Sequence, residues 1–138
     1  MDRAFASAYN TLSRFCCALD ARDYEALVRC FAPDGVWLRQ GKALKGGDQI
    51  RQILTQTRPA TLTTMHVVTN VCIDDHSERT ASGRFYLTVY RHDSGTTAAS
   101  PFPVPSPSVV GLCKAMFTLI ENRWLLQRLE TGPYVFTS

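Results

Sequence analysis

The stretch Thr61-Leu62-Thr63-Thr64-Met65-His66-Val67-Val68-Thr69-Asn70-Val71-Cys72-Ile73-Asp74 decides the fold. Val, Ile and Thr dominate it, and these residues suit the pleated, half-buried surface of a sheet. Side chains alternate between the two faces of a strand, so the predicted faces carry His66, Val68, Asn70 and Cys72 on one side and Met65, Val67, Val71 and Ile73 on the other. Both faces of this long strand are therefore expected to be largely covered.

Helices are predicted before this strand. Apolar residues recur at helical spacing from residue 3 to 20, which predicts an amphipathic helix with the stripe Phe5, Ala8, Tyr9, Leu12, Phe15, Cys16 and Leu19. Asp23 can cap a second helix, in which the apolar pattern continues to Phe31. A third helix is expected to open at Gly46-Gly47-Asp48 and to end at Arg58-Pro59.

A turn and a short strand are predicted between the second and third helices. Ala32-Pro33-Asp34-Gly35 is expected to stop the second helix and to reverse the chain, because proline cannot continue a helix and Asp-Gly favours tight turns. Residues 36–40 then predict a strand with Trp37 and Arg39 on one face.

Strands follow the third helix to the end of the chain. Besides the focal strand, they are expected over residues 82–91, 109–120 and 124–136, with a hairpin turn at 121–123. Residues 93–108 carry four prolines at alternating positions, which predicts an extended loop. Whether Phe85, Leu87 and Val89 or Tyr86, Thr88 and Tyr90 join the face of His66 depends on the hairpin register, which the sequence leaves open.

This element order predicts one α+β domain over residues 1–138. The expected architecture is a cone-shaped, curved antiparallel sheet with three N-terminal helices packed on its concave face. Such a cone leaves a cavity, and concave apolar cavities with a few polar groups are where small molecules bind. An apolar outer face of the sheet also predicts a symmetric homodimer that uses this face.

The composition excludes several classes of partner. The chain is 45% hydrophobic and 20% charged, with a net charge of +3, so neither a nucleic acid nor a membrane is an expected partner. The odd number of cysteines and the lack of a C-x-x-C spacing predict buried free thiols and no metal site: Cys16, Cys17, Cys30, Cys72 and Cys113. With no secretory signal at Met1-Asp2-Arg3, a cytoplasmic location is expected.

Several segments together resemble a known family. They are Leu19-Asp20-Ala21-Arg22-Asp23-Tyr24-Glu25-Ala26-Leu27, Phe31-Ala32-Pro33-Asp34-Gly35-Val36, Leu44-Lys45-Gly46, Ile50-Arg51 and Thr64-Met65-His66-Val67-Val68-Thr69-Asn70. In element order they resemble the SnoaL-like branch of the nuclear-transport-factor-2-like superfamily over nearly the whole chain. The resemblance implies the fold, while the superfamily hosts isomerases, dehydratases, cyclases, epoxide hydrolases, dioxygenase small subunits and non-catalytic binders.

The resemblance also bears on individual residues. His66 is similar in place to a catalytic histidine of scytalone dehydratase. The helix-borne aspartate of those dehydratases falls on Cys17, and their tyrosine falls on Arg39. In ketosteroid isomerases the tyrosine that binds the oxyanion falls on Phe15, and the aspartate that acts as the base falls on Arg39. The resemblance therefore implies a pocket, and neither of these two catalytic sets is complete in this sequence.

His66 is the best candidate for chemistry, because histidine commonly serves as a general base near neutral pH. The competing interpretation is a neutral core histidine bonded to a neighbour. Arg39 beside Trp37 favours a carboxylate or enolate in the ligand, or else lies along the indole ring at the surface. Asn70 lies about 13 Å from His66 along the strand and either holds another part of the ligand or closes a local network.

The sequence therefore predicts a cofactor-free protein that binds a small hydrophobic, cyclic molecule. His66 acts as acid and base in an isomerase-, dehydratase- or cyclase-like reaction, Arg39 offsets negative charge, and Phe15, Trp37 and Val68 shape the pocket. The alternative is a non-catalytic ligand-binding or accessory subunit, as in the small subunits of ring-hydroxylating dioxygenases.

Overall fold

The computed structural model describes residues 3–97 and 99–138. In chain order its elements are α1 (Arg3–Asp20), α2 (Tyr24–Val28), β1 (Phe31–Arg39), β2 (Lys42–Lys45), α3 (Gly46–Thr57), β3 (Leu62–His76), β4 (Thr80–Asp93), β5 (Val109–Ile120), β6 (Arg123–Thr131) and β7 (Phe136–Thr137). The predicted bounds of α1 and β5 agree with the structure residue for residue. The side chain of Asp23 caps α2, as predicted, by accepting a hydrogen bond of 3.0 Å from the backbone N–H of Ala26.

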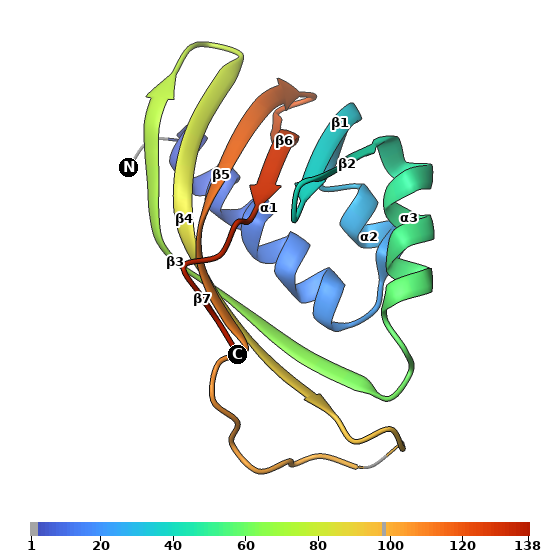
Figure 1. The fold of residues 1–138 in the computed structure, drawn as a ribbon. Coiled ribbons are helices and arrows are strands. Elements are labelled where there is room, and N and C mark those ends of the chain that lie inside the picture. Colours follow the sequence, from blue (N-terminus) through green and yellow to red (C-terminus); the bar gives the residue numbers. More distant parts are fainter. Residues whose placement is uncertain (1–2, 98) are drawn as a thin grey trace.

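The strands form one curved sheet in the order β2-β1-β6-β5-β4-β3, and β7 pairs with β5. It does not close into a barrel, and α1 lies in its concave side with α2 and α3 beside β1 (Figure 1). The predicted α+β architecture with helices on the concave face is confirmed. The sheet differs from the prediction in one respect, because β1 pairs with β6 in parallel whereas the other pairs are antiparallel.

The core lies between α1 and the concave face of the sheet. The buried stripe of α1 includes Leu12, Phe15 and Leu19, as predicted, whereas Tyr9 is 43% exposed. Phe15 packs edge-on against Trp37 of β1, with their ring centroids 5.1 Å apart. This contact joins α1 to the sheet at the point where the cavity described below begins.

The turn predicted at residues 32–35 is wrong, because this segment belongs to β1. The backbone N–H of Leu126 donates a 2.8 Å hydrogen bond to Cys30, and Phe31 pairs with Leu126. The register between β1 and β6 shifts between Phe31 and Val36, so the Pro-Asp segment forms a bulge within the strand. Helix α2 consequently ends at Val28 and not at Phe31.

Two further strand predictions need correction. The sequence analysis missed β2, which pairs with the end of β1 as a short edge strand. The last strand was predicted over residues 124–136, but β6 ends at Thr131. The next residue, Gly132, has a φ of 127°. Glycine adopts this backbone conformation readily, and here it separates β6 from β7, which turns back onto β5.

A bulge at Asn70 changes which residues of β3 face the helices. Asn70 has a φ of 54°, and the register with β4 shifts between Thr69 and Cys72. Before the bulge, Thr64 and His66 face inward; after it, Val71 and Ile73 pack against the core instead of sharing a face with Met65 and Val67. The predicted alternation therefore fails beyond Thr69, because the inserted residue reverses the pattern.

The β3–β4 register settles the face that the sequence left open. His66 pairs with Val89, and Val68 pairs with Leu87. Directly opposite residues point to the same side of a sheet, and Phe85, Leu87 and Val89 are buried. These apolar side chains therefore line the concave face, while Tyr86 lies on the outer face.

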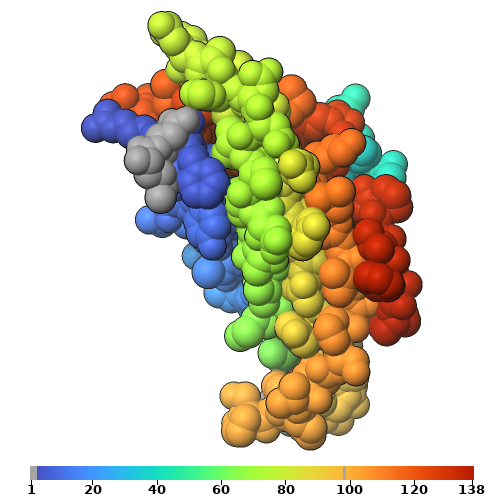
Figure 2. Space-filling model, turned by 90° about the vertical axis from the view of Figure 1, so that its left-hand side faces the viewer, coloured from blue at the N-terminus to red at the C-terminus, as the bar shows by residue number. Residues whose placement is uncertain are grey.

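The outer face of β3, β4 and β5 is open in the single chain, contrary to the prediction that both faces are covered. Figure 2 shows these strands side by side, in green, yellow and orange, with no helix across them. We call this surface the outer patch, and its exposed large apolar residues are Met65, Val67, Tyr86, Leu112 and Met116. Lys114 lies among them and is exposed.

The five cysteines are free, but not all are buried as predicted. Cys17 is exposed and Cys72 is half-buried, because residue 17 turns away from the stripe of α1 and Cys72 follows the bulge in β3. Burial raises the pKa of the Cys113 thiol to about 12 and that of Cys30 to about 11.

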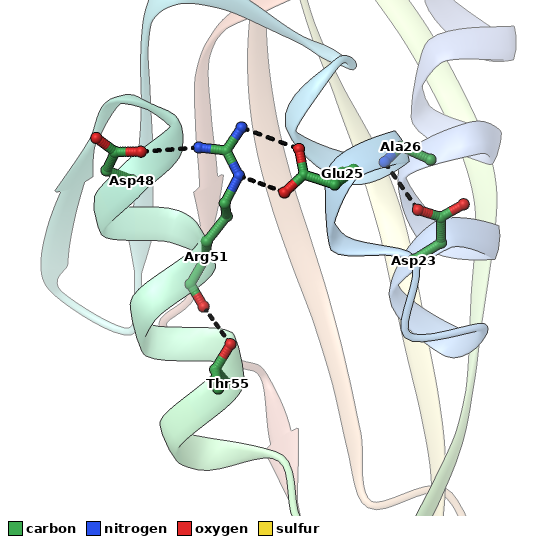
Figure 3. A network of polar contacts seen from close by, with 6 residues as sticks. All are labelled: Asp23, Glu25, Ala26, Asp48, Arg51 and Thr55. Atoms are coloured by element: carbon green, nitrogen blue, oxygen red, sulfur yellow. Dashed lines mark hydrogen bonds and ion pairs between the residues drawn. The ribbon is translucent and has the colours of Figure 1, made fainter.

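Helices α2 and α3 are joined by an ion-pair network at the surface (Figure 3). The guanidinium of Arg51 donates to both carboxylate oxygens of Glu25, at 2.7 and 3.1 Å, and to Asp48 at 2.9 Å. The two-pronged contact fixes the relative positions of these short helices over the end of the sheet that holds the cavity.

Candidate functional site

A cavity of about 230 Å³ opens between α1, the end of α3 and the concave face of the sheet. It is lined by Phe15, Leu19, Trp37, Arg39, Gln40, Leu54, Arg58, Thr64, His66, Leu87, Val89, Arg91, Ser108, Val109, Thr131, Tyr134, Thr137 and Ser138. Four residues predicted from the sequence meet here: Phe15, Trp37, Arg39 and His66. The cavity is small for a ligand site, so a molecule of one or two rings fits its size.

His66 is held against Asp20, the last residue of α1. Its Nδ1 lies 2.5 Å from Oδ1 of Asp20, and its backbone N–H donates to Oδ2 at 2.8 Å. The side chains of His66 and Asp20 are 10% and 20% exposed, so the pair is shielded from bulk water. Because Nδ1 faces the carboxylate, Nε2 is the ring nitrogen left to act on a ligand in the cavity.

A second layer of contacts holds Asp20 in place. The hydroxyl of Thr64 donates to Oδ1 of Asp20 at 2.9 Å and accepts from Nη2 of Arg58 at 2.7 Å. Burial lowers the pKa of the Arg58 guanidinium, and its Nε has no hydrogen-bond partner among the described residues. The chain of contacts from Arg58 to His66 fixes the orientation of the imidazole ring.

Asp20 is the functional residue that the sequence analysis missed. The resemblance to dehydratases directed attention to Cys17 as the position of a helix-borne aspartate, whereas this chain carries its carboxylate one turn later. A signal was present, because Asp20 follows Cys16 by four residues and so continues the buried stripe of α1. An aspartate on such a stripe needs a buried partner, and His66 provides it.

The other predicted residues have different surroundings. Trp37 donates from Nε1 to the hydroxyl of Thr131 at 2.7 Å, and the guanidinium of Arg39 lies 5.9 Å from the centroid of the indole ring. Val68 packs against the core beyond the cavity. Asn70 is exposed at the bulge of β3 and is not among the residues that line the cavity.

The cavity is positively charged. Arg39, Arg58 and Arg91 line it, whereas no Asp or Glu side chain does so among the described residues. In residues 3–97 and 99–138 no group of three or more His, Cys, Asp or Glu side chains is placed to hold a metal ion. No helix in the same part of the chain is long and apolar enough to cross a membrane.

Solved structures share this fold over nearly the whole chain. A candidate scytalone dehydratase from Novosphingobium aromaticivorans is 18% identical with a TM-score of 0.80, covering 97% of this chain and 85% of that chain. ActVI-ORFA from Streptomyces coelicolor is 16% identical with a TM-score of 0.71, covering 95% and 96%. A candidate aromatic ring hydroxylase from N. aromaticivorans is 20% identical with a TM-score of 0.73, covering 96% and 91%.

These identities are low, so the three likenesses concern the fold. No curated protein matches the chain. A family model, described as the SnoaL-like domain, matches residues 5–130. The match spans α1 to β6 and includes both Asp20 and His66. By this match and by the curved sheet with its concave helices, the chain belongs to the SnoaL-like domain family within the nuclear-transport-factor-2-like fold.

Proposed function

We propose that this protein, acting as a single domain over residues 1–138, binds a hydrophobic cyclic molecule and moves a proton on it without a cofactor. The reaction class is that of an isomerase, dehydratase or cyclase-like enzyme, with His66 as acid and base. The observation that carries the proposal is the contact of 2.5 Å between Nδ1 of His66 and Oδ1 of Asp20 at the wall of a cavity with both apolar and cationic lining residues. A carboxylate that orients a histidine is a recurrent arrangement in acid–base catalysis.

The geometry assigns a role to each group. With Nδ1–H donated to Asp20, Nε2 of His66 removes a proton from a carbon beside a carbonyl group, and the electron pair moves to the carbonyl oxygen. The carboxylate of Asp20 stabilises the imidazolium, while Arg39 offsets the negative charge of the enolate. The imidazolium then returns the proton to another carbon, which completes an isomerisation, or to a departing hydroxyl, which releases water.

The shared fold supports a small-molecule pocket, since structures with this fold include a candidate scytalone dehydratase and a Catenulispora acidiphila protein in complex with S-DNPA. Phe15 and Trp37 provide aromatic walls on one side of the cavity, and Leu87 and Val89 provide aliphatic walls on the other. These residues favour a flat, apolar ring system as the ligand.

A proton-exchange assay tests the proposal. The protein is incubated in D2O with a panel of one- and two-ring cyclic ketones such as 2-tetralone, and loss of the proton signal beside the carbonyl is followed by NMR. We expect acceleration over buffer, with a loss of roughly a hundredfold or more in His66→Gln. The matched control His92→Gln removes a histidine that stacks on Phe102 outside the cavity and should keep the rate. Equal rates in wild type and His66→Gln, with unchanged melting curves, would exclude His66 as the base.

The outer patch favours a second proposal, that the chain works in an assembly. Met65 alone is 63% exposed, and the outer patch spans three adjacent strands. We propose that a second copy of the chain covers it in a symmetric homodimer. The alternative is an accessory subunit of a larger enzyme, in keeping with the fold shared with a candidate aromatic ring hydroxylase. Ligand binding without proton exchange in the assay above would favour the accessory role.

The location of the protein is also a proposal. All five cysteines are free thiols, and three of them are buried. Free thiols of this kind persist in a reducing compartment, which favours the cytoplasm. The net charge of +3 is small, so we propose neither a nucleic acid nor a membrane as a partner.

A further inference from the structure

Three arginines reach the cavity from three separate elements. Arg39 ends β1, Arg58 follows α3, and Arg91 lies near the end of β4. None of them forms an ion pair with a carboxylate in the described part of the chain, in contrast to Arg51, Arg84 and Arg128. Asp20 attracts Arg58 across the hydroxyl of Thr64, and Asp93 lies near Arg91, but neither carboxylate makes a direct ion pair with these arginines.

Two of these arginines converge on one residue. Arg91 is the cross-strand partner of Thr64, so the two side chains leave the sheet next to each other. Nη2 of Arg58 donates to the hydroxyl of the same Thr64 at 2.7 Å. Thr64 precedes His66 by two residues on the same face of β3, which corresponds to about 7 Å along the strand. The two guanidinium groups thus lie on the wall that carries the Asp20–His66 pair.

Arg39 lies on the opposite side of the cavity. It belongs to β1, and three strands, β6, β5 and β4, separate β1 from the edge strand β3, with the cavity in the curve between them. Its guanidinium lies near the face of the Trp37 ring, where it is directed by a cation–π contact. A ligand in the cavity is therefore placed between a pair of arginines with His66 on one side and a single arginine on the other.

The charge of these groups needs a partner of opposite sign. A guanidinium stays protonated at any physiological pH, and for the half-buried Arg39 and Arg58 the lack of a directly paired carboxylate among the described residues is costly. The Nε of Arg58 is buried without a hydrogen-bond partner among the described residues, so the protein itself leaves this donor unsatisfied. A carboxylate has two oxygen atoms, and each can accept a hydrogen bond from a different guanidinium group.

We propose that the substrate is a small organic acid of one or two rings whose carboxylate binds Arg58 and Arg91 beside Thr64. The inference rests on the proposed function, because it takes the cavity with His66 as the reaction site. Since Thr64 and His66 are about 7 Å apart along the strand, the carbon that loses a proton lies several bonds from the carboxylate. Arg39 then faces the carbonyl oxygen that becomes negative during the reaction.

Matched probes test this inference by isothermal titration calorimetry. The pair is 4-oxocyclohex-2-ene-1-carboxylate and its methyl ester, which differ in the charge of one group. We expect the acid to bind at least about tenfold more tightly than the ester, and high salt to reduce that preference. Arg91→Gln should remove most of the preference while leaving the affinity for the ester unchanged, and Arg91→Lys should retain part of it. Arg91 is exposed, so its variants should fold normally.

The control variant is Arg79→Gln, which removes the same charge at the other end of the β3–β4 hairpin. It should keep the full preference for the acid. Equal affinity for acid and ester, an unchanged preference in Arg91→Gln, an equal loss in Arg79→Gln, or no binding of either probe at millimolar concentration would each overturn the inference.

A further variant separates this inference from the proposed function. His66→Gln should retain the preference for the acid, because binding of the carboxylate does not need the imidazole. If the preference for the acid depends on Arg91 but neither wild type nor any variant catalyses proton exchange on the ligand, the inferred substrate class is supported and the proposed reaction is wrong. If protons exchange by way of His66 but acid and ester bind equally, the reaction survives and the acid inference fails.

Discussion

Asp20 makes contacts that all lead to β3, at Thr64 and at the backbone and ring of His66. The carboxylate at the end of α1 therefore serves both the position of the helix and the orientation of the imidazole. Removal of this carboxylate leaves the hydroxyl of Thr64 and the backbone N–H of His66 without an acceptor in a region shielded from water.

We predict that Asp20→Ala lowers the free energy of unfolding by about 2 kcal/mol, because buried donors at Thr64 and His66 lose their acceptor. Urea denaturation followed by circular dichroism measures the change. Asp75→Ala is the control, since Asp75 is exposed at the far end of β3. Equal stability of the two variants would mean that the Asp20 contacts do not contribute to folding.

Thiol reactivity provides a second prediction for single residues. Burial raises the pKa of Cys16, Cys30 and Cys113, so these thiols stay protonated and inaccessible at pH 8. With a chromogenic disulfide reagent, native protein should show one fast thiol, which disappears in Cys17→Ser, and a slower reaction at Cys72. Five thiols should react in denaturant. Rapid reaction of the remaining thiols in the native Cys17→Ser protein would contradict the packing of α1 on the sheet.

Helix α2 has only five residues and depends on its contacts with neighbours. Its link to α3 is the ion pair of Glu25 with Arg51, which Figure 3 shows from close by. The hydrogen bond from Arg51 holds the pKa of Glu25 below its ordinary value. A lowered carboxyl pKa contributes stability above the unfolded value near 4.5, and this stability is lost as the pH falls through the folded value.

We predict that wild type melts at a higher temperature than Glu25→Gln at pH 7 and that the difference shrinks as the pH falls below 4.5 and disappears below the lowered pKa of Glu25 in the folded protein. Melting curves by circular dichroism between pH 7 and pH 3 measure this. High salt should reduce the difference at pH 7, because the pair is exposed. Glu78→Gln, in the turn after β3, is the control and should follow wild type at all pH values.

The bulge of β3 depends on a glycine in the neighbouring strand. A Cβ at Gly83 would overlap the backbone carbonyl oxygen of Cys72, beside the register shift. We predict that Gly83→Ala lowers the free energy of unfolding by about 2 kcal/mol, because backbone cannot move aside as a flexible side chain can. Ser82→Ala, the neighbouring change in β4, should stay within about 0.5 kcal/mol of wild type. Urea denaturation of both variants measures the difference.

For the whole molecule, the curved sheet separates two surfaces. Its concave face encloses the cavity with His66, and its convex face presents the outer patch. Assembly through the convex face leaves the concave face, and the cavity in it, accessible to a ligand.

We predict a dimeric mass by light scattering at micromolar concentration and a monomeric mass for Met116→Arg, because a charge buried in an apolar interface cannot be solvated there. Ala43→Arg is the control, since Ala43 is apolar and exposed but lies on β2, at the other edge of the sheet from the outer patch. A monomeric mass for wild type would contradict the proposed dimer, and a dimer that persists in Met116→Arg would place the interface elsewhere.

The sequence predicted the elements whose signals are local. The apolar stripe of α1, the cap at Asp23 and the limits of β5 depend on residues close in the chain, and each agrees with the structure. The turn predicted at residues 32–35 failed because pairing with β6, about ninety residues later, holds that segment as a strand. The preference of residues 32–35 for a turn is worth less free energy than the pairing of β1 with β6.

The residues of the candidate site also divide into those that local sequence identifies and those that only tertiary packing brings together. Phe15, Trp37, Arg39 and His66 could be named from residue type and strand alternation, and all four line the cavity. Asp20 and Arg58 escaped notice because their role depends on the place where α1 and α3 end against β3. Asn70 was assigned to the face of His66 because the regular alternation was extended through a position that the structure uses for a bulge.

By itself the sequence determined the family, the α+β architecture and the histidine on which the proposed chemistry centres, because periodicity and short motifs are encoded by neighbouring residues. Only the tertiary structure decided that a carboxylate from the end of α1 holds this histidine and that three arginines line the cavity. Those relations join residues as far apart as Asp20 and His66. They follow from how the helices pack into the curved sheet, which no local pattern specifies.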